Sequence, residues 1–168
     1  MSEQERQRAR RDERATNPPP IRLTERDIQI IRAVYECRVL TIQQLQVLFF
    51  PSLHQAYARL AALYHHAYLD RKFVGAYIDK MNTPIMYVLD KRGADLLQAE
   101  LGLEVNWSSE YKHVGVQFLE HTLAINTCRV AVAKACAENS GFSLVKWLSE
   151  ADLKADYDRV TIRSTAGK

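Results

Sequence analysis

The side chains with the clearest chemistry lie on one side of a helix predicted between Ser52 and His66. Glutamine can pair with adenine and arginine with guanine in the major groove of DNA, and small alanines beside them allow a close approach. The helix therefore predicts a DNA-reading surface, in which Gln55 and Arg59 contact bases while His54 and Ser52 lie nearer to phosphate. An ordinary solvated helix face is the alternative. Because this face is thinly basic, high affinity would need further contacts.

A basic segment follows this helix. From Arg71 to Arg92 the chain holds five basic and two acidic residues, a local net charge of +3. Lysine and arginine beside hydrogen-bond donors are typical of surfaces that contact DNA phosphates. The residues expected to make such contacts are Arg71, Lys72, Tyr77 and Lys80. Charge that merely protects the exposed edge of a hairpin is the alternative.

Motifs for catalysis or metal binding are missing from the sequence. It contains no P-loop, no GxGxxG and no GxSxG. His121 and Cys128 are two helical turns apart, farther than the ligands of one ion usually sit. Acidic residues gather between Glu150 and Asp158 without the lysine-bearing strand of a nuclease, so surface solvation explains them best. We expect no catalytic residues, no metal and no cofactor, and therefore no enzyme.

The elements that must position the DNA-reading surface follow from caps and hydrophobic spacing. Capping boxes beginning at Thr24, Thr41 and Ser52 predict three helices with short connections. Two β-rich stretches, 68–74 and 85–89, enclose a turn-rich loop, and Asp90 caps a fourth helix that ends at Gly102. The expected fold class is mainly α with a small β-hairpin: a winged helix-turn-helix, followed by a long helix and the start of an α/β element.

The region after Gly102 is predicted to contain a helix from about His113 to Glu138, then strands at 142–148 and 157–162. One stripe of that long helix is apolar, and a small winged core cannot cover it. We therefore predict an antiparallel homodimer in which two copies of the helix pair. The dimer residues are Phe118, Ile125, Val132 and Ala135. Alternatively, the stripe packs on Trp107, Phe142 and Trp147 of the same chain. The unpaired final strand suggests a truncated chain, or a sheet completed elsewhere.

Composition adds coarse limits. The chain has 168 residues, 47% of them hydrophobic, which is enough for a core, and a net charge of +3. Residues 1–22 hold six arginines and four acids and end in prolines, which predicts a disordered basic arm. The expected divisions are this arm, a winged helix-turn-helix at 23–102 and a third part at 103–168. Three scattered cysteines indicate a reducing cytoplasm, and no apolar run is long enough for a membrane span.

Several phrases resemble the replication-relaxation family of plasmids and integrative elements. The similarity is spread over residues 21–100, with looser matches at His121 and at 147–150. The phrases are LTERD at 23–27, YECRVLT at 35–41, ARL at 58–60, YLDR at 68–71 and YVLDKRGA at 87–94. The resemblance implies a winged-helix DNA-binding module tied to plasmid replication and relaxation. It also implies that family members continue into a nuclease-like α/β domain, which would begin where this chain ends.

The expected function is therefore non-enzymatic binding of double-stranded DNA on a mobile element, with a relaxase or a replication protein as the protein partner. A transcriptional regulator of the same fold is the first alternative. A winged-helix protein-interaction module without DNA affinity is the second, and the N-terminal part of a nuclease-like enzyme is the third.

Overall fold

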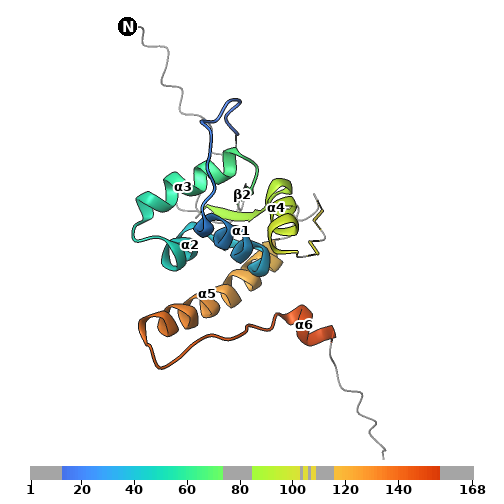
Figure 1. Cartoon of the computed structure of the whole chain (residues 1–168). Coiled ribbons are helices and arrows are strands. Elements are labelled where there is room, and N and C mark those ends of the chain that lie inside the picture. The colour runs from blue at the N-terminus through green and yellow to red at the C-terminus, as the bar shows by residue number, and fades with distance from the viewer. Residues whose placement is uncertain (1–12, 74–84, 103, 106, 109–115, 156–168) are drawn as a thin grey trace, which may run out of the picture.

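The computed structural model describes residues 13–73, 85–102, 104–105, 107–108 and 116–155 (Figure 1). Three helices come first: α1 (Glu25–Cys37), α2 (Ile42–Phe49) and α3 (Leu53–His65). Each begins where the sequence predicts. The Thr24 backbone N–H donates to the Asp27 carboxylate over 2.7 Å, and the Thr41 N–H donates to Gln44 Oε1 over 2.9 Å. Pro51 prevents α2 from continuing.

A three-stranded antiparallel sheet backs these helices. Its strands are β1 (Leu40–Thr41), β2 (Leu69–Lys72) and β3 (Met86–Leu89), in the order β1-β3-β2. Strands β2 and β3 form the predicted hairpin, with Arg71 opposite Tyr87. Strand β1 was not expected, and it pairs Leu40 with Tyr87 from the other side. The loop predicted between the hairpin strands, which includes Tyr77 and Lys80, lies outside the described residues.

Helix α4 (Lys91–Leu101) follows β3 and is capped as predicted. The Asp90 carboxylate accepts from the Lys91 backbone N–H over 2.8 Å, and Gly102 ends the helix with a φ of 60°. Gly93 permits the close approach of α4 to the sheet, because a Cβ at this position would lie 2.2 Å from the Tyr68 carbonyl oxygen. Trp107 then packs against the core, and its Nε1 donates to the Leu89 carbonyl over 3.3 Å.

The core lies between the helices and the sheet. It is formed by the apolar faces of α1, α2 and α3, by alternating strand residues and by Leu97 of α4. Its largest fully buried side chains include Ile30, Ile31, Leu60 and Tyr87. This core explains why the three short helices are stable. Each Å² of apolar surface that is removed from water contributes about 25 cal/mol to folding, and this gain offsets the entropy lost when the chain is ordered.

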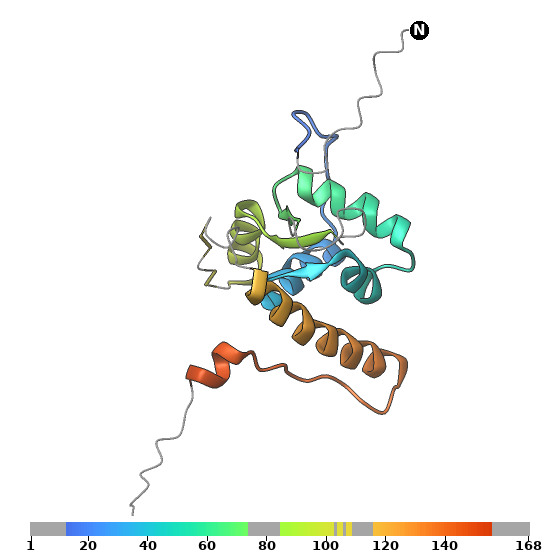
Figure 2. The same ribbon diagram turned by 180° about the vertical axis from the view of Figure 1, so that it is seen from behind.

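Helix α5 (Val116–Glu138) confirms the predicted long helix. Viewed from both sides, it runs beneath α1 and α2 (Figures 1 and 2). Its buried residues are Leu119, Asn126 and Val130, which lie about 140° around the helix from the apolar stripe singled out in the sequence. Phe118 and Val132 of that stripe are 41% and 42% exposed. Among the described residues, no helix combines the length and apolar character needed to cross a membrane.

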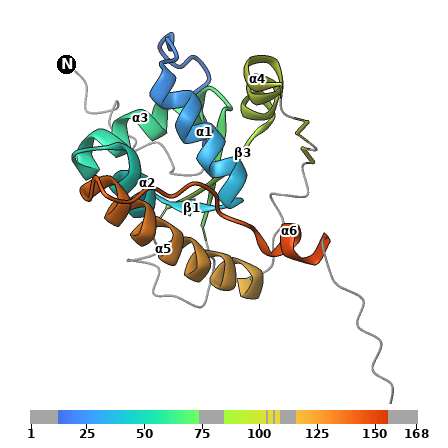
Figure 3. The same cartoon turned by 60° about the horizontal axis from the view of Figure 1, so that its bottom comes forward.

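The chain after α5 differs from the prediction. Residues 142–148 make no β-sheet pairing with another described segment, and they run back along α5 in an irregular path (Figure 3). A short helix, α6 (Glu150–Ala155), follows, and its Asp152 carboxylate accepts from the Ser149 N–H over 2.8 Å. The strand expected at 157–162 lies outside the described residues.

Candidate nucleic-acid interface

The outward side of α3 carries the polar residues singled out in the sequence. His54, Gln55 and Ala58 are exposed, whereas Ala56 and Leu60 on the other side are fully buried. Ser52 caps the helix, and its hydroxyl oxygen accepts from the Gln55 backbone N–H over 3.3 Å. The structure therefore brings Ser52, His54 and Gln55 together at the N-terminal end of α3, as a DNA-reading helix requires.

Arg59 has a different environment from its neighbours. Its Nε donates to Asp27 Oδ1 over 2.7 Å, and its Nη2 donates to Asp27 Oδ2 and, over 2.8 Å, to the Arg22 carbonyl. Asp27 is fully buried. Burial alone would raise the pKa of this carboxyl, but the hydrogen bonds from Arg59 and Thr24 hold it below its ordinary value. The ion pair fastens α3 to α1, so a base contact by Arg59 would require its release.

Arg71 and Lys72 lie on β2 beside α3, and both are half-buried. The Arg71 guanidinium lies over the Tyr64 ring, 4.3 Å from its centroid, and 5.8 Å from the Tyr87 centroid. Much of its planar face is thus covered by aromatic rings. Lys72 is one residue nearer to the hairpin loop.

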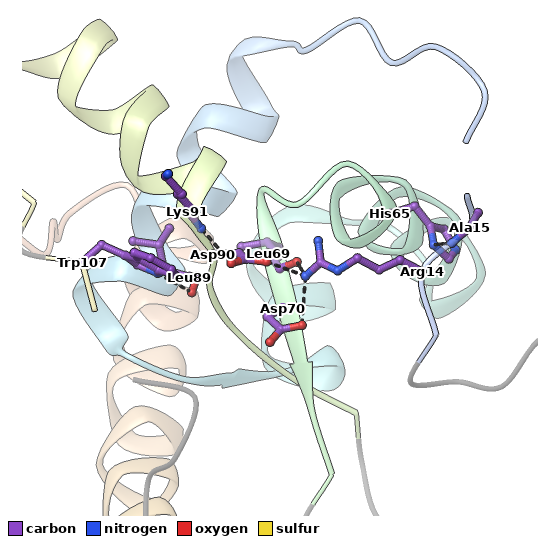
Figure 4. Close-up of polar contacts among 9 residues, drawn as sticks. All are labelled: Arg14, Ala15, His65, Leu69, Asp70, Leu89, Asp90, Lys91 and Trp107. Atoms are coloured by element: carbon purple, nitrogen blue, oxygen red, sulfur yellow. Dashed lines mark hydrogen bonds and ion pairs between the residues drawn. The ribbon is translucent and has the colours of Figure 1, made fainter. Parts of the chain in front are cut away.

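The expected disordered arm is wrong for residues 13–22, because Arg14 is anchored to the domain (Figure 4). Its Nη2 lies 2.9 Å from Asp70 Oδ1 and 2.5 Å from Asp90 Oδ2, and its guanidinium stacks on Tyr64 at 4.6 Å. Two carboxylates and a ring offset the entropy cost of ordering this segment. Arg6, Arg8, Arg10 and Arg11 lie outside the described residues.

Two histidines continue this attachment along the end of α3. The Ala15 backbone N–H donates to His65 Nδ1 over 3.0 Å, and His66 Nε2 donates to the Pro19 carbonyl over 2.8 Å. Burial is the largest cause that lowers the pKa of His65, and the positive charges of Arg71 and Arg14 lower this pKa further. A neutral His65 ring can accept the Ala15 hydrogen bond. The segment 13–22 therefore covers the C-terminal flank of α3 and leaves its N-terminal half accessible.

Sequence reasoning missed the three acidic residues that organise this surface: Asp27, Asp70 and Asp90. Asp27 and Asp90 do show a sequence signal, since each occupies a helix-capping position, but capping alone does not reveal an arginine partner. In the described part of the chain, no three His, Cys, Asp or Glu side chains gather as a metal site would require.

Comparison with known proteins adds one finding. A family model described as replication-relaxation matches residues 31–162, which are 132 of the 168 residues. The match includes α2, α3, the hairpin strands and α5. No curated protein and no solved structure matches the chain. The breadth of the family match establishes that this chain belongs to the replication-relaxation family, which suggests a role related to plasmid replication or relaxation.

Proposed function

We propose that the chain is a winged helix-turn-helix protein that binds double-stranded DNA and assists plasmid replication or DNA relaxation in the cytoplasm without itself catalysing a reaction. The observation that carries this proposal is α3: its inner side is buried against α2 and β2, while its N-terminal half presents His54, Gln55 and Ala58 outward beside the β2–β3 hairpin. A helix of this kind enters the major groove, and the hairpin meets the adjacent backbone.

The roles within this interface differ. Gln55 is the proposed base-reading residue, and Ser52 and His54 are proposed to approach phosphate. Lys72, with Tyr77 and Lys80 of the hairpin loop, is proposed to contact the backbone. Arg59 and Arg71 contribute chiefly by holding α3 and β2 in place, because their guanidinium groups already contact Asp27 and Tyr64.

The first experiment identifies the site and then tests the helix. DNA fragments bound by the protein are selected from its source genome, and fluorescence anisotropy measures the affinity for the enriched duplex and for a scrambled one. Gln55→Ala should cost about 1–3 kcal/mol on the enriched duplex and relax specificity at one position. Gln98→Ala, the same change on the exposed side of α4, is the matched control and should change neither affinity. Equal losses on both duplexes would contradict base reading by Gln55.

A homodimer is the proposed assembly, and a relaxase or a replication protein is the proposed protein partner. The dimer is supported by the outer face of α5, where Phe118 and Val132 are exposed and Ile125 is half-buried. Ala135 is also exposed. Two copies would place two α3 helices on one duplex.

A protein-interaction module is a second candidate function, because α2 and α3 also expose apolar side chains. Val47, Leu53 and Tyr57 are 42%, 39% and 43% exposed. Fluorescence anisotropy at two salt concentrations separates the candidates. If the protein binds DNA phosphates, the logarithm of the binding constant falls with the logarithm of the salt concentration, with a slope of about −0.9 for each phosphate contact. If the protein binds no duplex even at low salt, the interaction module is favoured.

A separate assay tests for nuclease activity. Incubation with supercoiled plasmid and Mg²⁺ should leave the plasmid uncut if the protein is no nuclease.

A further inference from the structure

The link between α1 and β1 contains a strained arginine. Arg38 has a φ of 64° and a ψ of −42°, and the Val39 N–H donates to the Cys37 carbonyl over 2.8 Å. This is a γ-turn centred on Arg38 in its rare, strained form, which a residue with a Cβ adopts only when its surroundings enforce it. Such strain is found most often where a side chain must be held in a functional position.

A buried side chain of α5 enforces this turn. Asn126 is 3% exposed, and its Nδ2 donates to the Cys37 carbonyl over 3.0 Å and to the Val39 carbonyl over 2.7 Å. Both carbonyls that flank Arg38 are therefore held by one amide. Arg38 itself is exposed, so the buried brace fixes the backbone while the guanidinium remains at the surface.

Two adjoining cavities open beside Arg38, with volumes of about 310 and 220 Å³. Glu36, Arg38, Arg129, Trp147 and Ser149 line both of them. Trp107 adds a second indole to the larger cavity. Trp147 and Ser149 belong to the segment that runs back along α5 to α6 (Figure 3), so this segment forms one wall of both cavities. The larger cavity has the size of a small-molecule site.

The charges of this site leave Arg38 available. Glu36 is paired with Arg129 at 2.6 Å and with Arg32 at 2.8 Å, and Asp152 accepts hydrogen bonds from Ser149. Among the described residues, no carboxylate lies within ion-pair distance of Arg38, whose guanidinium is 5.8 Å from the Phe118 ring centroid. The site thus combines indole surfaces with an uncommitted guanidinium held by a strained turn.

We propose that the larger cavity forms a nucleotide-binding site, in which a base packs against Trp107 or Trp147 and a phosphate binds Arg38. Indole rings stack on bases, and guanidinium groups bind phosphate with charge-assisted hydrogen bonds. The nucleotide is either a free mononucleotide or one unit of single-stranded DNA. This site is separate from the duplex-binding face of α3, and it stands whether or not that face binds DNA.

Intrinsic fluorescence tests the proposal directly, since the only two tryptophans of the chain line the larger cavity. The full chain is titrated with a nucleoside monophosphate, with the matching nucleoside, and with a short oligothymidine that lacks terminal phosphates. Quenching by the monophosphate alone identifies a free nucleotide as the ligand, and tighter quenching by the oligothymidine identifies single-stranded DNA. Quenching by neither, or equal affinity for the nucleoside and its monophosphate, would overturn the proposal.

Two variants of Arg38 separate ligand binding from stability. Arg38→Gln should weaken quenching by the preferred probe about tenfold or more, while Arg26→Gln, an exposed arginine at the other end of α1, should not. Arg38→Gly should weaken it equally and yet raise the melting temperature, because glycine adopts a positive φ without strain. Unchanged affinity in Arg38→Gln would refute the assignment of phosphate to Arg38, and a lower melting temperature in Arg38→Gly would refute the strained turn that is argued to hold it.

Discussion

The ion pair between Asp27 and Arg59 should be among the most stabilising polar contacts of the domain. The Asp27 side chain is 0% exposed and the Arg59 side chain 26%. Removing one partner of a buried pair typically costs about 3–5 kcal/mol, because the other charge stays buried without compensation. Arg59→Gln should therefore lower the melting temperature by about 6–20 °C, given about 2–4 °C per kcal/mol for a chain of this size. Thermal unfolding followed by circular dichroism measures this loss.

The pH dependence provides an independent check. The pKa of Asp27 in the folded chain is below its ordinary value of 3.8, so its charged form stabilises the fold above that value. This stabilisation is lost as the pH falls through the depressed folded-state pKa. The difference in melting temperature between the wild type and Asp27→Asn should consequently be constant near neutral pH and shrink below about pH 4.

Controls make this test specific to the buried pair. Lys134→Gln breaks an exposed pair with Glu138, at 3.7 Å, and should cost no more than about 0.5 kcal/mol. In a double-mutant cycle, Asp27→Asn and Arg59→Gln should show strong coupling. A cost below about 1 kcal/mol for Arg59→Gln, or a pH-independent difference for Asp27→Asn, would refute the reasoning. Arg59→Gln should reduce the affinity for the enriched and the scrambled duplex by the same factor. A larger loss on the enriched duplex would instead indicate that Arg59 contacts bases.

Three further predictions follow from packing. Gly93→Ala should cost at least about 2 kcal/mol in urea unfolding because its Cβ would overlap the Tyr68 carbonyl, whereas Gly141→Ala, whose nearest atom is 3.5 Å away, should be neutral. Deleting residues 1–12 should leave the melting temperature unchanged, but deleting 1–20 should lower stability by about 1–3 kcal/mol because Asp90 loses Arg14. Val132→Glu should give a folded monomer by light scattering, and an unchanged dimer would contradict pairing through α5.

The elements near the core could be predicted from the sequence because several signals coincide there. Caps, turn residues and hydrophobic spacing all indicate α1, α2, α3 and the hairpin strands, and the structure contains each of them. Strand β1 was missed because two residues show no alternation. Its pairing depends on β3, which is more than forty residues away in the chain. The γ-turn at Arg38 was missed because no glycine marks it.

Hydrophobic periodicity alone could not predict which face of α5 is buried. Apolar side chains occur all around this helix, so the stripe through Phe118 and Val132 looked as suitable for burial as the one through Leu119 and Val130. Polar contacts decided the outcome. Asn126 bonds the Cys37 and Val39 carbonyls, and Gln44 Nε2 donates to Thr127 Oγ1 over 3.1 Å. Only the face bearing these side chains can satisfy the buried polar groups that it meets.

The arginines near the proposed DNA-binding face show the same role of polar contacts. Sequence counting treats Arg14, Arg59 and Arg71 as charge available to DNA, but the fold binds each of them to carboxylates or tyrosine rings. The described surface around α3 consequently offers little free positive charge, so one copy would make few phosphate contacts. Because linking two weak sites on one duplex raises affinity through effective concentration, the proposed α5 dimer would compensate for this deficit. DNA affinity and dimerisation should therefore be lost together in Val132→Glu, even though Val132 lies on α5 and not on α3.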